Sequence, residues 1–173
     1  GPFPACTRPE ATSVGARAIQ RWCRPVAFQN VPDELLPEEL REANPRGIAV
    51  WGGRVFAADD QHHRVAVFDV AGRLVTSIGT QGSGPGQLNY PYGVAVDPKG
   101  RVFVADDLNH RVVRFGGVPL YPYRSRWGSY GTGPGQLAYP RNIATDAAGN
   151  VYVTNTGDDR IDVFDLNGRL LRS

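Results

Sequence analysis

DDQHHRVAVF (residues 59–68) returns as DDLNHRVVRF (residues 106–115), and an altered third copy, NTGDDRIDVF, occupies residues 155–164. The anchors around these copies keep one register: Pro45, Pro91, Pro140, Arg64, Arg111, Arg160, Phe68, Phe115 and Phe164. The prolines are 46 and 49 residues apart, and repeats of about 40 to 50 residues are typical of propeller blades. Three repeats therefore cover residues 44–173.

Each repeat carries the signals of short strands separated by turns. The small-residue segments GIAV, GVAV and NIAT are followed by RVFAAD, RVFVAD and NVYVTN, and then by RVAVFD, RVVRFG and RIDVFD. These runs alternate or are rich in β-branched residues, and glycine-bearing turns separate them. A fourth strand is expected from RLVTSIG. The sequence predicts an all-β fold of three four-stranded antiparallel blades of a β-propeller.

The full pattern resembles the NHL-repeat family of six-bladed propellers. It consists of Pro-x-Gly, a small-residue strand, Asp-x-x-x-His-Arg and a closing aromatic, with the junctions GSGPGQL (residues 82–88) and GTGPGQL (residues 131–137). The resemblance implies a rigid interaction platform; some members bind RNA, some serve as extracellular sensor or adhesion domains, and a few related propellers are lyases or hydrolases. Two departures stand out. Asn142 replaces the inner-strand glycine, and residues 116–127 replace the usual turn and outer strand of the second repeat.

Three blades cannot close a ring, because each blade of a propeller hides its faces against its neighbours. Exposed apolar faces would remain on the end blades. We expect completion by a longer parent protein, by a second copy or by another subunit, and the longer parent is favoured.

The repeated polar motif is interpreted as architecture. A residue present in every blade is expected to make the same local bonds in every blade: the first Asp accepts turn N–H groups and the Arg bridges to the neighbouring blade. The alternative is a metal centre, for which His62, His63 and His110 with Asp60 and Asp107 supply ligand atoms. Successive residues of a turn point apart, however. We therefore predict no catalytic residue, no metal and no cofactor.

Partner contacts are expected where the turn between the second and third strands meets the blade junction, because both lie on one rim. A second candidate is the aromatic and arginine-rich insertion, since Tyr, Trp and Arg dominate interface hot spots, although these rings are equally suited to packing an outer strand. The predicted partner-binding residues are Arg46, His62, His63, Tyr90, Tyr92, Asn109, His110, Tyr121, Tyr123, Arg124, Arg126, Trp127 and Arg141.

Residues 1–43 do not repeat and are expected to form an adaptor or cap. They hold both cysteines, Cys6 and Cys23, which fits one disulfide in an exported protein or two free thiols in a cytosolic one. No apolar run approaches the roughly 20 residues of a membrane-spanning helix. The net charge of +2 argues against nucleic acid as a partner.

The function expected from the sequence is that of a non-enzymatic scaffold, extracytoplasmic in location, that binds a partner protein within a larger complex. The alternatives are a metal-dependent lyase or hydrolase of propeller type and an RNA-binding NHL module. RNA would contact Arg46, Tyr92, Arg141 and the insertion, and the small net charge weakens that alternative.

Overall fold

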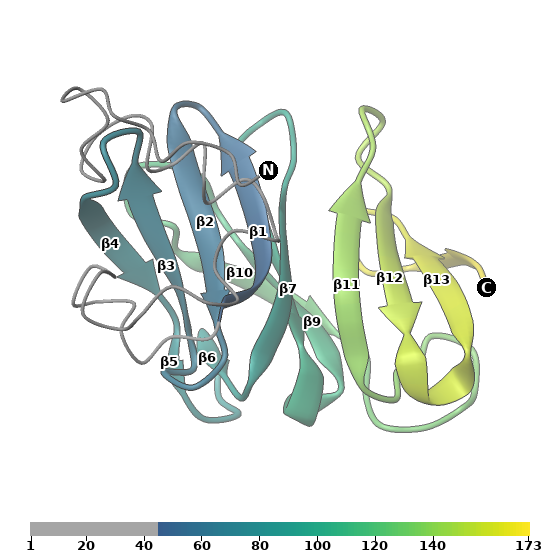
Figure 1. The fold of residues 1–173 in the computed structure, drawn as a ribbon. Coiled ribbons are helices and arrows are strands. Elements are labelled where there is room, and N and C mark those ends of the chain that lie inside the picture. The colour runs from purple at the N-terminus through teal and green to yellow at the C-terminus, as the bar shows by residue number, and fades with distance from the viewer. Residues whose placement is uncertain (1–44) are drawn as a thin grey trace, which may run out of the picture.

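The computed structural model describes residues 45–173, which form three four-stranded antiparallel sheets side by side (Figure 1). The predicted segment 1–43 and its Cys6–Cys23 disulfide lie outside the described residues. The sheets are blade 1, with β1 (Pro45–Trp51), β2 (Arg54–Asp59), β3 (Arg64–Asp69) and β4 (Leu74–Ile78); blade 2, with β7 (Pro91–Val96), β8 (Val102–Asp106), β9 (Arg111–Phe115) and β10 (Tyr123–Trp127); and blade 3, with β11 (Pro140–Thr145), β12 (Val151–Asn155), β13 (Arg160–Phe164) and β14 (Leu170–Arg172).

Consecutive strands pair within each blade, so the predicted meander is confirmed and the row of blades is not closed into a ring. Two 3₁₀ turns, Asp107–Asn109 and Thr156–Asp158, follow β8 and β12. The blade 1 to blade 2 junction adds a two-stranded parallel pair, β5 (Thr80–Gln81) with β6 (Gln87–Leu88). No helix among residues 45–173 has the length and apolar character needed to cross a membrane.

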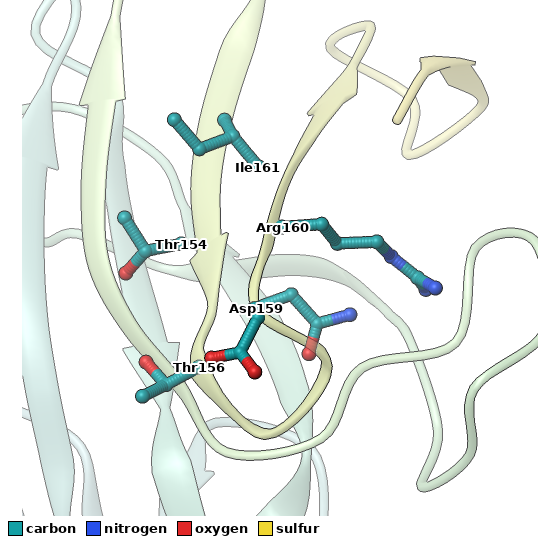
Figure 2. Close-up of a pocket in the computed structure, with 6 residues that line it drawn as sticks. Thr154, Thr156, Asp159, Arg160 and Ile161 are labelled. Atoms are coloured by element: carbon teal, nitrogen blue, oxygen red, sulfur yellow. The ribbon is translucent and has the colours of Figure 1, made fainter.

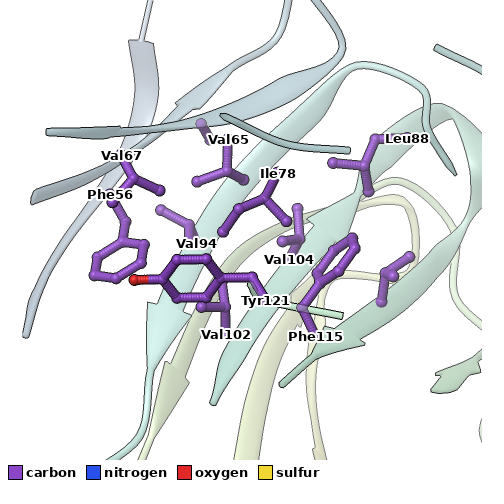
Figure 3. Packing of buried hydrophobic residues seen from close by; sticks show 12 residues of the cluster. Phe56, Val65, Val67, Ile78, Leu88, Val94, Val102, Val104, Phe115 and Tyr121 are labelled. Carbon is purple, nitrogen blue, oxygen red and sulfur yellow. The ribbon is translucent and has the colours of Figure 1, made fainter. Parts of the chain in front are cut away.

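The core lies between the blades. Figure 3 shows Phe56 and Val65 of blade 1 facing Val94 and Val102 of blade 2, with the ring of Tyr121 among them. A second cluster joins blades 2 and 3. Because blade 2 has a neighbour on both faces, every residue of β8 is buried, whereas burial alternates along β12 of blade 3. The period-two pattern of a half-covered sheet thus appears in blade 3, which packs against another described blade on one face only.

The inner strands β1, β7 and β11 run next to one another, and glycine allows their close approach. A Cβ at Gly47 would lie 2.8 Å from both Gly93 Cα and Tyr92 O, and a Cβ at Gly93 would overlap Arg141 O. Asn142, which stands at the same position in blade 3, is exposed. Its side chain is tolerated because no described residue packs against it as blade 3 packs against Gly93.

The second blade differs from the sequence prediction. Residues 116–127 do not replace the outer strand, because they contain it: β10 pairs with β9 in an antiparallel ladder with a register shift between Tyr123 and Ser125. What is inserted is a longer loop, in which Tyr121 N–H donates to Gly117 O and the Val118–Pro119 bond is cis.

Candidate functional site

The repeated Asp and Arg hold each blade junction in place. In blade 2, buried Asp106 accepts hydrogen bonds from the Asn89 N–H at 2.6 Å and from Arg111 Nε at 2.7 Å. Arg111 also donates to Ser83 O at 2.7 Å and Gln87 O at 2.8 Å, both in the GSGPGQL junction. In blade 2, the first Asp and the Arg of the motif therefore make the structural contacts expected from the sequence, since they join this blade to the preceding junction.

Blade 3 makes the same connection, but the hydrogen bond between the strand-end residue and the turn residue runs in the opposite direction. Asn155, which replaces the first Asp, accepts the Ala138 N–H through Oδ1 at 2.7 Å. Its Nδ2 donates to Asp158 Oδ2 at 2.9 Å and Asp162 Oδ2 at 2.8 Å. Arg160 donates to Asp162 and to carbonyls of the GTGPGQL junction. The third repeat is therefore a rewired version of the motif.

The three histidines lie on the predicted rim but point to different partners. His63 Nδ1 accepts the Tyr90 N–H at 3.1 Å, and His110 Nδ1 accepts the Tyr139 N–H at 3.3 Å. Each imidazole also packs edge-on against that tyrosine, with ring centroids 4.8 Å apart. His62 instead meets Asp59 through Nδ1 at 2.9 Å. Among residues 45–173, no group of three or more His, Cys, Asp or Glu side chains is placed to hold a metal ion.

The insertion contributes mainly to packing. Trp127 is buried beside Phe103 and Phe164, and Tyr121 packs against Phe56 with ring centroids 5.7 Å apart. The expectation that these two rings present a contact surface was wrong, because blade-to-blade packing buries them. Tyr123 is half-buried against Phe115.

The remaining two insertion residues lie at the surface. Arg126 donates to Ser83 O at 2.5 Å, and Arg124 is exposed. Neither is brought close to the rim residues by any contact in the described chain. Asn109, another predicted contact, donates to Asp106 and to Gly82 O and so belongs to the junction.

The best candidate site is a cluster on the rim at the start of the inner strands. It consists of Arg46, Asp60, Tyr92, Asp107 and Arg141, and we call it the rim cluster. The Cζ atoms of Arg46 and Arg141 lie 5.3 and 5.2 Å from the centroid of the Tyr92 ring. Cation–π attraction therefore holds both guanidinium groups against one tyrosine.

The two aspartates of the rim cluster are buried beneath it. Asp60 is 4% exposed and accepts from Arg46 Nε at 2.9 Å, and Asp107 is 8% exposed. One oxygen of each, Asp60 Oδ1 and Asp107 Oδ1, has no hydrogen-bond partner in the described chain. Sequence reasoning placed Arg46, Tyr92 and Arg141 on this rim but considered Asp60 and Asp107 only as metal ligands. The repeat register, which puts an Asp directly after the second strand of blades 1 and 2, was the available signal.

Burial raises the pKa of Asp107, and the positive charge of nearby Arg141 only partly opposes the shift. A raised folded-state pKa means that ionised Asp107 destabilises the fold at neutral pH, and that this cost shrinks as the pH falls below the folded-state pKa and is lost below the unfolded-state pKa. We expect Asp107→Asn to raise the free energy of unfolding at pH 7 by about 1 kcal/mol. In urea titrations, the gain should shrink when the pH is lowered toward 4.

Asp106→Asn is the matched control, because Asp106 makes three charge-assisted bonds and its replacement should destabilise the protein at pH 7. A loss of stability in Asp107→Asn at pH 7 would show that the Asp107 charge is needed to hold Arg141.

An open hollow of about 400 Å³ lies on the outer face of blade 3, lined by Thr154, Asn155, Thr156, Asp159, Arg160 and Ile161. Figure 2 shows Thr154 and Ile161 on neighbouring strands and Arg160 directed away from them. Ile161 is 56% exposed, whereas Val65 and Val112, at the same position of blades 1 and 2, are fully buried. Sequence reasoning predicted an open end blade but did not name these residues.

Comparison with known proteins supports the fold. A profile of the family described as "6-bladed beta-propeller" matches residues 37–118. The RING finger protein nhl-1 of Caenorhabditis elegans is 48% identical over 52 residues, 30% of this chain and 5% of its own length. Alpha-ketoglutaric semialdehyde dehydrogenase 2 of Azospirillum brasilense is 60% identical over 48 residues, 28% of this chain and 9% of its own. The chain thus spans less than a tenth of these curated relatives.

Solved structures share the architecture at low sequence identity. Kuenenia stuttgartiensis hydrazine synthase has a TM-score of 0.59 at 17% identity, over 75% of this chain and 35% of that one. A Bacteroides fragilis protein described as exported has a TM-score of 0.57 at 17% identity, over 75% of this chain and 37% of its own. Staphylococcus aureus virginiamycin B lyase has a TM-score of 0.56 at 15% identity, over 74% of this chain and 40% of its own. These likenesses show the fold alone. The repeats, the blades and these matches together show a β-propeller fold, with repeats similar to those of NHL-type propellers.

Proposed function

We propose that the protein is a non-enzymatic interaction platform that binds a partner protein through the rim cluster. The observation that carries the proposal is the pair of exposed arginines, Arg46 on β1 and Arg141 on β11, whose guanidinium groups both lie against the ring of Tyr92. Arginine and tyrosine are enriched among residues that dominate binding energy at protein interfaces. A ring that fixes two guanidinium groups also reduces the side-chain entropy lost on binding.

The use of the remaining polar residues supports a binding role over a catalytic one. Asp59, Asp106, His63 and His110 each bond to a neighbouring arginine or to a junction N–H. A general base needs a free lone pair directed at a substrate, and a metal ligand needs one directed at the ion. The same bonds recur from blade to blade, whereas a catalytic centre is a single constellation.

The partner contact can be tested by placing a photo-crosslinking amino acid at position 92 and irradiating the protein in an extract of its source organism. The expected result is a discrete crosslinked protein that disappears when Arg141→Gln is added. The same amino acid at Val75, an exposed position of the outer strand β4, serves as the control. Equal crosslinking from both positions would contradict the proposal.

The enzymatic alternative has its own outcome. The likeness to virginiamycin B lyase brings a lyase into consideration. A stoichiometric metal found by elemental analysis, and lost in a His62→Ala, His110→Ala double variant, would overturn the non-enzymatic proposal. An extracytoplasmic location is likewise proposed, supported by the Cys6 and Cys23 pair of the sequence and by the fold shared with a protein described as exported. A disulfide detected by mass spectrometry of the non-reduced protein is the expected result.

A second contact is the outer face of blade 3, and we infer that another blade covers it. At the two blade interfaces in the structure, a junction leucine, Leu88 or Leu137, packs in the cluster that contains Val65 or Val112. Ile161 offers the same apolar position, and Asp159 stands where His63 and His110 accept a tyrosine N–H. Self-association of the chain, measured by light scattering, is expected to fall in Ile161→Asp. If the unmodified chain and the Ile161→Asp variant both have the mass of a monomer, a second copy is excluded as the covering blade.

A further inference from the structure

The rim cluster presents cations at the surface and keeps its anions below it. From this arrangement we propose that it recognises an acidic segment of the partner protein, with two carboxylates paired to Arg46 and Arg141 across the Tyr92 ring. The inference rests on the proposed function and names the chemistry of the partner.

Arg141 is the more available cation. No side chain or carbonyl among residues 45–173 accepts a hydrogen bond from its guanidinium, and the side chain is exposed. Arg46 donates through Nε to Asp60, and its side chain is 39% exposed. The bond to Asp60 does not use the terminal nitrogens of Arg46, and a guanidinium binds a carboxylate through two parallel hydrogen bonds from such nitrogens.

The buried aspartates determine which anion fits. Asp60 and Asp107 offset the charges of Arg46 and Arg141, so the rim cluster carries no net charge, and the whole chain carries only +2. Polyphosphate chains bind through many phosphate contacts in a field of positive charge. A site without that field gains little from a long polyanion. It gains instead from short-range pairing at the two guanidinium groups, which individual carboxylates provide.

The spacing favours an extended ligand. Arg46 and Arg141 come from β1 and β11, two strands apart on either side of β7, with Tyr92 between them. In an extended chain, side chains two residues apart point to the same side and are about 7 Å apart. A segment with alternating acidic residues can therefore direct carboxylates at both arginines while its backbone crosses the tyrosine ring.

The proposal can be tested by titrating a dye-labelled nonapeptide that alternates glutamate and serine with the full chain. The fluorescence anisotropy of the dye measures binding. We expect saturable binding that weakens at least tenfold in Arg141→Gln and when glutamine replaces every glutamate. Arg172→Gln is the matched control, because Arg172 is an exposed arginine on β14 with the same charge. It should bind like the unmodified chain.

A gain-of-function variant protects the test from folding artefacts. Asp107→Asn removes the anion nearest to Arg141 and should tighten peptide binding severalfold. Equal binding by Arg141→Gln and the unmodified chain, or tighter binding of a uridine oligonucleotide than of the peptide, would overturn the inference. If crosslinking from position 92 still depends on Arg141 while the acidic peptide fails to bind, the rim remains a protein-binding site and only the acidic character of the partner is refuted.

Discussion

Arg111→Ala is expected to lower the free energy of unfolding by about 3 to 5 kcal/mol, the cost of leaving a buried charge without its partner. Arg111 is 5% exposed, and its partner Asp106 is fully buried. Burial already raises the pKa of Asp106, and Arg111 is among the groups that oppose this shift. The substitution also leaves the carbonyls of Ser83 and Gln87 without their donor, which loosens the junction between blades 1 and 2.

Urea unfolding at pH 7 measures this loss, and the same experiment near pH 4 provides an internal check. Lowering the pH protonates Asp106 and removes the unpaired charge, so the difference between variant and parent should become smaller. Arg64→Ala is the matched control in blade 1. Its side chain is 24% exposed and reaches Asp59 and the Ser77 hydroxyl, with no junction carbonyl among its described partners. Arg64→Ala should therefore cost less, and equal costs would show that the junction bonds add nothing.

The fold was predictable because each strand has its own local signal. β2, β8 and β12 occupy the predicted segments RVFAAD, RVFVAD and NVYVTN, where β-branched residues are bounded by glycine turns. The same repeat register placed Arg46, Tyr92 and Arg141 on one rim. Local patterns were sufficient here because a propeller blade is a sequential meander, in which neighbours in sequence are neighbours in space.

Features that depend on contacts between blades were not predictable in this way. Tyr121 and Trp127 have the composition of an interface hot spot, yet they are buried because the adjacent blades present Phe56 and Phe164 to them. The contact of Arg46 with buried Asp60 likewise depends on side-chain geometry. The altered third repeat was interpreted as a departure from the motif, since the partner of Asn155 on β13, Asp162, becomes visible only in the strand register.

Asn155→Asp is expected to destabilise the protein by about 3 kcal/mol, because it would place a third buried carboxylate beside two others. Asn155 Nδ2 donates to Asp158 Oδ2 and Asp162 Oδ2, and after the substitution these two oxygens would face a carboxylate oxygen in place of the amide N–H donors. In blade 2 the corresponding residues are Asp106, Asn109 and Val113, where the strand-end group accepts and the turn residue donates. In both blades the junction N–H donates to the strand-end side chain, whereas the bond between the strand-end residue and the turn residue runs in opposite directions.

The rewiring can be reversed as a unit. The triple variant Asn155→Asp, Asp158→Asn, Asp162→Val restores the arrangement of blade 2 and keeps an acceptor for the Ala138 N–H. It should recover most of the stability lost in the single variant, as measured by urea unfolding. Such recovery requires coupling between the three sites, which for residues in one hydrogen-bond network reaches about 0.5 to 3 kcal/mol per pair. Additive losses would instead mean that each residue of blade 3 is adapted to its own surroundings, independently of the other two.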